Sequence, residues 1–388
     1  MYSDPCRYRN MIQRIKCFVR CSVFAAWGRR TGVQVAGTRI APFRSRICYT
    51  LLCMDSVEPA FLLAETFQGG SMQSPVICPT CKVRDFRSYG QRRYGRDAIE
   101  RSHGWTKNAL RILFERWIPD VAEAQFEFLA CSNCGLMIYE PRPTTQDIAD
   151  KYSYVGGLGD ATPSKSERPE RTALRARRVF GLMSRHLSHG ARTALDFGGG
   201  DGRLLQKFVD RGFDCALVDY ADRPVPGVRK IADTERGIPR QDRYDAILCS
   251  HVVEHLPDPL ETLQELRRSL AADGVLYVEV PYEMYRQLPA RSEPVTHVNF
   301  FTPASLHNLL QAAGYDVVRC EIDLYPHPKG HWSLCVGAIA TSGNGRSQRR
   351  ADGLEALDRA IAPSRGRRLA IRAFQKFYPR IAMARYRI

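Results

Sequence analysis

The sequence of 388 residues predicts an α/β protein built around a doubly wound, mostly parallel β-sheet. Over residues 170–341, apolar runs typical of strands alternate with amphipathic patterns typical of helices. One of these runs leads directly into a glycine-rich turn. The composition, 44% hydrophobic and 25% charged, is that of a globular chain and excludes a wholly disordered protein. No apolar run approaches the roughly 18 residues of a membrane span, which excludes an integral membrane protein.

The elements of this domain are expected in a regular order. A helix over 170–186 precedes the first strand. Strands are predicted from short apolar runs at 193–197, 215–219, 246–249, 275–280 and 316–320. Helices are predicted between them at 203–210, 260–270 and 303–313. The last helix has a clear beginning, because Thr302 and Pro303 are typical of a helix start.

The net charge of +16 lies at the two ends of the chain. Residues 1–53 hold ten Lys or Arg and one acid, whereas residues 340–388 hold twelve and three. The remaining residues, 54–339, hold 35 basic and 37 acidic side chains. The centre of the chain is therefore almost neutral, and the total charge does not by itself indicate a nucleic-acid-binding protein.

The N-terminal residues 1–72 are basic and show no sustained helical or strand period, so we expect an irregular extension there. Three interpretations remain open: a transit peptide, a secretory signal, and a segment that is not part of the working protein. In the third case translation begins at Met54 or Met72, just before the first recognisable motif.

A glycine-rich segment, Gly198-Gly-Gly-Asp-Gly202, follows the first strand. Glycines at such a turn adopt positive φ and let a ligand approach the backbone. Asp196 lies just before the turn, and Asp219 ends the next strand, where an acid can bind both hydroxyls of a ribose. The spacing Gly-x-Gly-x-Gly differs from the Gly-x-Gly-x-x-Gly that directs a helix N-terminus at a pyrophosphate. The sequence therefore favours a nucleotide-like ligand without phosphate, with a dinucleotide or a bare tight turn as alternatives.

Together with Tyr244-Asp-Ala-Ile-Leu-Cys-Ser-His-Val-Val-Glu-His-Leu256, this pattern resembles the class I S-adenosylmethionine-dependent methyltransferases over about residues 170–340. The resemblance implies a Rossmann-like sheet of seven strands and S-adenosyl-L-methionine as the cofactor. It implies that the glycines pack against the methionine part and that acids after the second and third strands lie at the ribose and the adenine. The predicted cofactor-binding residues are Asp196, Gly198, Gly200, Gly202, Asp219, Asp233, Ser250 and His251.

Methyl transfer is an in-line displacement in which the enzyme mainly positions the reactants. An oxygen or carbon acceptor also has to lose a proton, and a base of near-neutral pKa, such as histidine, suits this step. His297 lies in a loop after the fifth strand, where the family places its acceptor, and His251 follows the fourth strand. Tyr282 and Glu283, directly after the fifth strand, are further catalytic candidates. A purely structural role is the alternative for each of them.

Two Cys-x-x-Cys pairs, Cys78 with Cys81 and Cys131 with Cys134, have the spacing of zinc knuckles. We expect them to hold one structural Zn²⁺ in a small module over residues 73–150, with disulfides and free thiols as alternatives. A four-thiolate site leaves no open position for catalysis. The odd total of 13 cysteines suits a reducing, cytoplasmic compartment.

The cysteine pairs followed by the methyltransferase pattern resemble, over about residues 75–340, bacterial methyltransferases of sugar, surface-polysaccharide and natural-product biosynthesis. This resemblance implies a sugar, glycan or other small-molecule acceptor, methylated on oxygen or carbon. In the carbon-methylating members a Glu/His-rich cluster follows the fifth strand, and residues 282–284 match it only partly, so an oxygen acceptor is expected at least as strongly.

Two other functions are compatible with parts of the sequence. One is an RNA or other nucleic-acid methyltransferase that binds through the zinc module and the basic tails. It is disfavoured by the neutral centre, and by residues 250–255, where amino-methylating enzymes commonly carry an Asn/Asp-Pro-Pro-aromatic run. The other is a non-catalytic binding module, which the intact glycine turn and Asp219 disfavour.

Two segments flank the methyltransferase domain. Residues 151–169, rich in Gly, Ser and Pro, are expected to form a linker or lid. Residues 342–388 form a basic tail, in which a helix is predicted from basic residues three or four apart, Arg365, Arg368, Arg372, Lys376 and Arg380. This helix either packs on the enzyme with a solvated basic face or, through residues 364–388, contacts an anionic membrane at the inner face.

Overall fold

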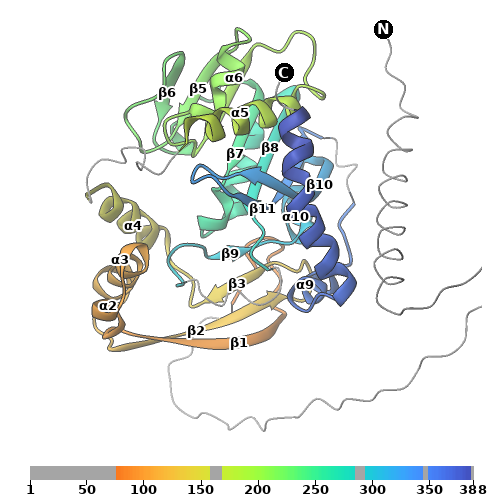
Figure 1. Ribbon diagram of the computed structural model, residues 1–388. Coiled ribbons are helices and arrows are strands. Elements are labelled where there is room, and N and C mark those ends of the chain that lie inside the picture. Colours follow the sequence, from red (N-terminus) through yellow and green to blue (C-terminus); the bar gives the residue numbers. More distant parts are fainter. Residues whose placement is uncertain (1–75, 158–167, 285–292, 344–347, 386–388) are drawn as a thin grey trace, which may run out of the picture. The chain divides into compact units, whose positions relative to one another are not determined.

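The computed structural model describes residues 76–157, 168–284, 293–343 and 348–385 (Figure 1). The expected N-terminal extension, residues 1–72, and the central part of the expected linker, residues 158–167, lie outside the described residues. Residues 72–388 form one compact unit, whose described part contains two sheets.

The larger sheet has seven strands in the order β10-β11-β8-β7-β4-β5-β6. The strands are β4 (Thr193–Phe197), β5 (Asp214–Val218), β6 (Val228–Ala232), β7 (Tyr244–Ser250), β8 (Leu270–Pro281), β10 (Asp316–Pro326) and β11 (Trp332–Thr341). The strands from β8 to β6 pair in parallel, whereas β11 pairs antiparallel with both β8 and β10. The predicted Rossmann-like, mostly parallel sheet of seven strands is confirmed.

Successive side chains of the central strands face two different cores. In β7, Ala246 and Leu248 lie in one core, and Ile247 and Cys249 lie in the other. This alternation is what strand geometry requires, and both faces are apolar because helices cover both. The covering helices are α5 (Pro169–Met183), α6 (Gln206–Val209), α7 (Pro259–Arg268) and α8 (Pro303–Ala312). The doubly wound arrangement is therefore confirmed.

Local sequence signals determine where two of these helices begin. The Asp258 side chain accepts a hydrogen bond from the backbone of Glu261 and caps α7. Thr302 and Ser305 form a reciprocal capping box at α8. The expected helix over 203–210 is shorter than predicted, because Arg203–Leu205 is a 3₁₀ turn and only Gln206–Val209 is α-helical.

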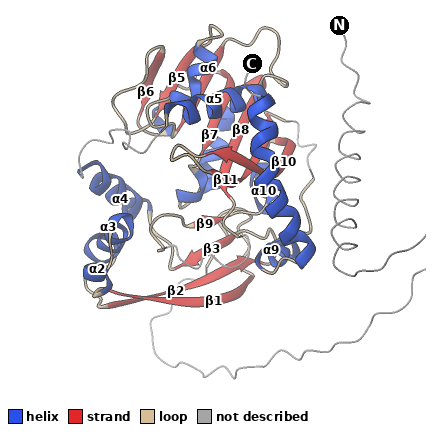
Figure 2. Ribbon diagram, in the orientation of Figure 1, coloured by secondary structure: helices blue, strands red, loops and turns tan. Residues whose placement is uncertain are grey.

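The smaller sheet has the order β1-β2-β3-β9. Its strands are β1 (Phe86–Gly95), β2 (Glu123–Cys131), β3 (Met137–Glu140) and β9 (Asn299–Phe300). Because β9 follows the fifth strand of the larger sheet along the chain, the expected separate module over 73–150 is wrong at its boundary. The aromatic ring of Phe300 packs edge-on against Tyr139, which joins the module to the larger domain. Figure 2 shows helices α2 (Ala98–Arg101), α3 (Gly104–Ile112) and α4 (Thr145–Gly157) grouped at one end of this sheet.

The expected linker over 151–169 also requires correction at both ends. Residues 151–157 are the last turns of α4, and Pro169 begins α5. Glycine lowers helix propensity by only about 1 kcal/mol, so the packing of the helix overrides it. Ile148 and Lys151 of α4 are both buried, and this tertiary contact extends the helix through Gly157.

The basic tail is helical, as predicted, and forms α9 (Gly353–Ile361) and α10 (Arg365–Arg385). Buried Leu357 and Ala360 anchor α9 in the core that includes the cysteine module. α10 packs against β10 and β11. Among the described residues, no helix is long and apolar enough to cross a membrane.

Candidate functional site

The predicted glycine turn has the backbone that its residues suggest. Gly198, Gly200 and Gly202 have φ of 68°, 64° and 75°, which side-chain-bearing residues rarely adopt. A Cβ at Gly198 would lie 2.4 Å from a methyl group of Val252, whereas a Cβ at Gly200 would meet nothing within 4 Å. The turn is thus packed at Gly198 and open at Gly200, where a ligand can approach the backbone.

The acid after β5 is joined to this turn. One carboxylate oxygen of Asp219 accepts a hydrogen bond from the amide of Gly200 at 2.8 Å, and the other accepts from Ala221 at 2.8 Å. The next residue, Tyr220, stacks on Tyr152 of α4 with ring centroids 5.3 Å apart. Asp219 therefore lies beside the open glycine turn, and its role in binding the ribose stays a prediction.

The acid after β6, Asp233, is exposed and forms an ion pair of 2.6 Å with Lys230, which also binds Asp222. It does follow the third strand, where the family places its adenine-side acid. Its role in binding the adenine stays a prediction.

Asp196 is a buried carboxylate with unsatisfied oxygens. Its side chain is fully buried, and neither oxygen has a hydrogen-bond partner among the described residues. Burial raises the pKa of Asp196 to about 7. A Cβ on Gly199 would lie 2.2 Å from its carboxylate, so it sits directly behind the turn. An orphaned carboxylate here fits a ligand that carries an ammonium group, as S-adenosylmethionine does.

Ser250 and His251 end β7 between charged side chains. The Ser250 hydroxyl accepts a hydrogen bond from Arg175 at 2.8 Å and donates to Glu279 at 3.2 Å. His251 has φ of 59°, and its Nδ1 lies 3.2 Å from a carboxylate oxygen of Glu254. Burial lowers the pKa of His251, but Glu254 and Glu279 outweigh this and raise it above the ordinary value. His251 is therefore held by two carboxylates.

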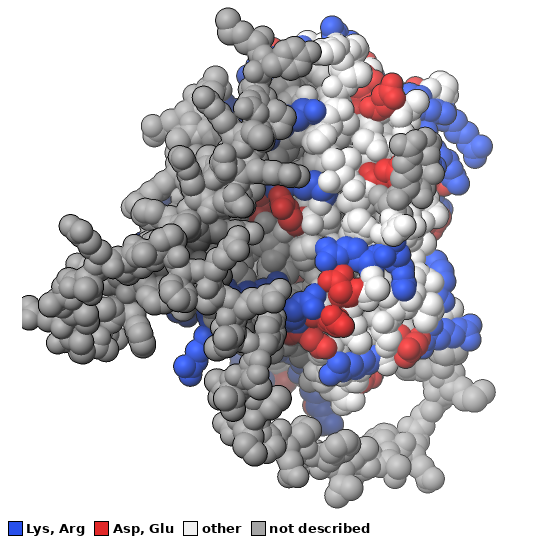
Figure 3. Space-filling view, turned by 90° about the vertical axis from the view of Figure 1, so that its right-hand side faces the viewer, with Lys and Arg blue, Asp and Glu red and all other residues white. Residues whose placement is uncertain are grey.

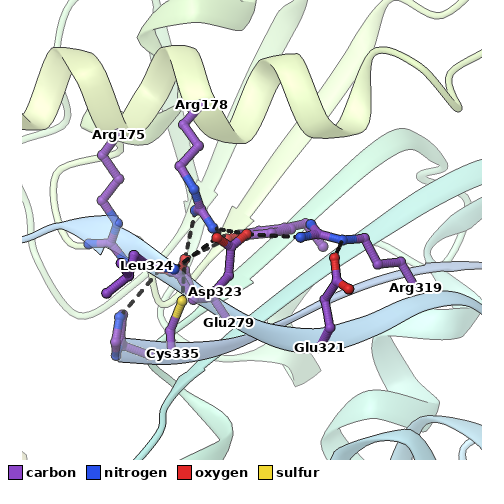
Figure 4. A network of polar contacts seen from close by, with 11 residues as sticks. Arg175, Arg178, Glu279, Arg319, Glu321, Asp323, Leu324 and Cys335 are labelled. Carbon is purple, nitrogen blue, oxygen red and sulfur yellow. Dashed lines mark hydrogen bonds and ion pairs between the residues drawn. The ribbon is translucent and has the colours of Figure 1, made fainter. Parts of the chain in front are cut away.

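Glu279 is the centre of a buried network that the sequence analysis missed (Figure 4). Its carboxylate accepts hydrogen bonds from Arg175 at 2.6 Å, from Arg178 at 3.0 Å and from Tyr277 at 2.6 Å. Arg178 also binds Asp323 at 2.7 Å. Burial alone would raise the pKa of Glu279, but Arg175, His251 and Arg178 hold it well below its usual range. The sequence feature that could have indicated this network is Glu279 itself, a charged residue within the apolar run 275–280.

His297 and Glu283, predicted separately, are hydrogen-bonded to each other. Nδ1 of His297 lies 2.9 Å from Oε2 of Glu283. Burial lowers the pKa of His297, but the hydrogen bond and the charge of Glu283 raise it above its ordinary value. Glu283 thus engages Nδ1 and leaves Nε2 for another partner. Tyr282 is buried next to Glu283, with its backbone amide bonded to Leu334.

His255 and Lys151 complete the surroundings of His297. The rings of His255 and His297 are 4.8 Å apart, and Nδ1 of His255 bonds the carbonyl of Thr296 at 2.5 Å. Lys151 of α4 donates to the carbonyl of Val295 at 2.9 Å, and burial lowers its pKa to about 8. Burial together with the charges of Lys151 and His297 lowers the pKa of His255 well below its ordinary value. No local pattern in the sequence marks Lys151, because only tertiary packing brings α4 to this site.

Three side chains of this site could also hold a metal ion. Ligand atoms of Glu254, His255 and His297 lie within 4.8 Å of one another. Glu254 is buried, and its Oε2 has no hydrogen-bond partner among the described residues. Two imidazoles and a carboxylate are a donor set that suits a divalent transition metal. The sequence favours structural pairing over catalysis for Glu254 and His255 and does not indicate a metal site there.

The four cysteines converge as predicted. Sγ of Cys78 lies 3.5 Å from that of Cys134, and Sγ of Cys81 lies 3.4 Å from that of Cys131. All four sulfurs lie within 4.8 Å of one another, and none of the four residues forms a disulfide. Tetrahedral zinc with Zn–S bonds of about 2.3 Å needs sulfurs roughly 3.8 Å apart, so the arrangement fits that ion.

The tail packs closely on the second cysteine knuckle. A Cβ at Gly135 would lie 2.3 Å from the backbone of Gly353, so two glycines permit this approach. Asn308 of α8 donates hydrogen bonds to the carbonyls of Cys134 and Arg350. The knuckle, α8 and the start of α9 are therefore packed as one substructure.

Comparison with known proteins locates this site within a family domain. Residues 166–319 match the family model described as a methyltransferase domain. The ubiquinone biosynthesis O-methyltransferase of Aeromonas salmonicida (strain A449) is 26% identical over 146 residues, which are 31% of this chain and 61% of the relative. That of Actinobacillus pleuropneumoniae serotype 7 (strain AP76) is 30% identical over 104 residues, which are 22% of this chain and 44% of the relative.

Among solved structures, the chain is similar to the Burkholderia thailandensis 1,6-didemethyltoxoflavin-N1-methyltransferase. The identity is 20%, the TM-score is 0.37, and the match covers 56% of this chain and 96% of the other. The order and direction of the strands, together with the match to the family model, lead to one conclusion. Residues 166–319 form a class I S-adenosylmethionine-dependent methyltransferase domain.

Proposed function

We propose that the chain transfers a methyl group from S-adenosylmethionine to a hydroxyl oxygen of a small-molecule acceptor. The observation that carries this proposal is the hydrogen bond between His297 and Glu283. This pair is linked to the glycine turn because Val252, which contacts the Gly198 position, accepts a hydrogen bond from the amide of His255. His255 in turn lies against His297.

Three features support the placement of the cofactor. The open backbone at Gly200 would admit its methionine part, Asp219 would accept hydrogen bonds from the ribose, and Asp196 would bind the amino group. When bound, the cofactor supplies an electrophilic methyl group on a sulfonium, which needs little activation by the protein.

The work left to the protein is to orient the acceptor and to accept its proton. Nε2 of neutral His297 accepts the hydroxyl proton as the oxygen attacks the methyl carbon. Glu283 holds Nδ1, selects the tautomer with a free Nε2, and stabilises the imidazolium that results. Lys151 and Glu254 place one cation and one carboxylate near the pair, and their roles are to position the acceptor and the histidines.

The acceptor class rests on two supports. The curated relatives are named ubiquinone biosynthesis O-methyltransferases, which favours a hydroxyl oxygen over a carbon. We infer a hydroxyl of a sugar, a glycan or a related small molecule, because the cysteine module before the domain resembles enzymes that act on such acceptors. On the face in Figure 3, basic and acidic side chains lie next to each other, and this mixture does not favour a nucleic-acid acceptor.

We also propose that the four cysteines hold one structural zinc ion. With four thiolates the coordination sphere is closed, so the ion would stabilise the module and take no part in methyl transfer. We expect elemental analysis to find about one zinc per chain and to find less after Cys134→Ser. Zinc retained unchanged by that variant would contradict the assignment.

The function is tested with S-adenosylmethionine carrying a labelled methyl group. The purified chain is incubated separately with pools of nucleotide sugars, polysaccharide, catechols and RNA. We expect label in a small-molecule or glycan pool, on an oxygen, with incorporation lost in the His297→Ala variant. Label found only in RNA, or cofactor binding without transfer to any pool, would overturn the proposal.

A further inference from the structure

The outward face of α10 combines exposed apolar side chains with unpaired basic ones. The inward face is anchored, because Ile371 is buried and the ring of Tyr378 packs edge-on against Trp332 of β11. On the other side of the helix, Leu369 is 63% exposed and Phe377 is 51% exposed. Exposed apolar side chains that lie among basic ones on one helix are typical of helices that bind at a membrane interface.

The charge of this face is entirely positive. The printed sequence of α10 holds seven Lys or Arg and no Asp or Glu. Arg365, Leu369, Arg372 and Lys376 recur at spacings of four, three and four residues, so they form one stripe along the helix. All four are exposed, and none of the three cations forms an ion pair within the described part of the chain. Leu369 thus lies in a row with three cations that have no acidic partner among the described residues, and one of them, Lys376, lies over the ring of Phe377.

We propose that this face of α10 binds the surface of an anionic lipid bilayer. A helix that presents apolar side chains among cations lies in the plane of the membrane interface, with the apolar groups inserted and the cations at the phosphates. Leu369 and Phe377 insert into the acyl boundary, while Arg365, Arg372 and Lys376 contact the headgroups. Each cation near such a surface strengthens binding about fivefold.

Other occupants fit this face less well. Residues 1–53 of the same chain are themselves strongly basic, with ten Lys or Arg and one acid, so charge repulsion opposes their docking here. A second copy of α10 would bring two positive stripes together. A nucleic acid would satisfy the cations but would leave Leu369 exposed to water. An anionic bilayer can bind both the exposed apolar side chains and the cations of this face.

The test is co-sedimentation of the full chain with phospholipid vesicles. We expect binding to vesicles that contain about 30% phosphatidylglycerol, weak binding to pure phosphatidylcholine, and loss of binding as salt rises from about 0.1 M to about 1 M. Arg365→Gln, Arg372→Gln and Lys376→Gln combined should weaken binding roughly 100-fold.

A second pair of variants separates insertion from charge alone. Leu369→Ser with Phe377→Ser, which removes the apolar groups without changing the charge, should strongly weaken vesicle binding, whereas Val121→Ser, at an exposed apolar residue outside α10, should leave it unchanged. Each variant should keep the melting temperature and the methyl transfer to a soluble acceptor, since no residue of the site lies on this face. Vesicle binding that persists in the charge variant would overturn the proposal. A wild-type chain that binds RNA but does not bind vesicles would also overturn it. If the wild-type chain showed no methyl transfer, the vesicle-binding test would still apply, because it does not depend on that activity.

Discussion

Two fully buried carboxylates of the same sheet have opposite surroundings. Glu279 of β8 accepts hydrogen bonds from two arginines and a tyrosine. Asp196 of β4 has no hydrogen-bond partner in the described part of the chain. Their pKa values diverge accordingly, because burial raises that of Asp196 to about 7, whereas the arginines hold that of Glu279 well below its usual range.

The difference separates a carboxylate whose charge is balanced within the protein from one whose charge is not. The bonds of Glu279 join α5 to β8 and, through Arg178 and Asp323, to β10. The carboxylate of Glu279 is therefore paired within the protein and needs no ligand to balance its charge. The desolvation of Asp196 is not offset within the protein, so a cationic ligand behind the glycine turn would gain from it. His297 is intermediate, because its Nδ1 has one carboxylate partner and its Nε2 has no hydrogen-bond partner among the described residues.

The largest effect should come from breaking the satisfied network. Arg178→Met leaves Glu279 and Asp323 without this partner, and removal of one member of a buried ion pair costs about 3–5 kcal/mol. Urea denaturation should show this loss of unfolding free energy. Arg177→Met, at an exposed position one residue earlier, should change it by less than about 0.5 kcal/mol. If the two variants had the same free energy of unfolding, the network would not have the structural role assigned to it.

Asp196→Asn should have the opposite effect on stability. In the folded state the pKa of Asp196 is raised from 3.8 to about 7. Between these pH values the folded protein keeps this proton, whereas the unfolded chain has lost it. The free energy of unfolding therefore falls as pH rises from about 4 to 7. At about pH 8 the amide should therefore stabilise the ligand-free protein by up to about 4 kcal/mol, with little change near pH 4.

The same variant should bind S-adenosylmethionine at least about tenfold more weakly, because the amide carries no charge for the amino group. Thermal unfolding across pH and calorimetric titration measure the two effects. Asp210→Asn, at an exposed aspartate, serves as the control for both. A gain in stability without loss of cofactor binding would show that Asp196 is not a ligand group.

His297→Ala should lower kcat by roughly 100-fold, about 2.7 kcal/mol in the barrier, because the general base is lost. Binding of S-adenosylmethionine should stay within about twofold, since the residue faces the acceptor side. The exposed His189→Ala is the matched control. Unchanged turnover in His297→Ala would rule this histidine out as the base.

Glu283→Gln should shift the pH profile. His297 acts as a base only when neutral, so kcat/KM falls as pH drops below its pKa, which Glu283 raises. Without that charge, the acid limb should move to lower pH by about one unit. Measurement of kcat/KM between about pH 5 and 9 checks this. An unmoved acid limb would mean that another group controls the profile.

The strands, the two capped helices and the glycine turn could all be predicted because their signals are local. Positive φ at Gly198, Gly200 and Gly202 follows from residue type and from the strand that precedes them. Two cysteine knuckles separated by a long insert were also predicted to meet, because four thiolates at this spacing have few other uses. The module boundary could not be predicted, since β9 joins the smaller sheet from a distant part of the chain.

The sequence by itself determined the fold class, the position of the cofactor turn and the set of candidate side chains. Only the tertiary structure decided which of these side chains are partners. Glu283 and His297 are 14 residues apart, Arg178 and Glu279 are 101 apart, and Lys151 and His255 are 104 apart. Local patterns report backbone preference and amphipathicity over a few turns, whereas these pairings depend on how whole elements pack. The packing therefore also decides which buried carboxylate, Glu279, is hydrogen-bonded and which, Asp196, has no partner among the described residues.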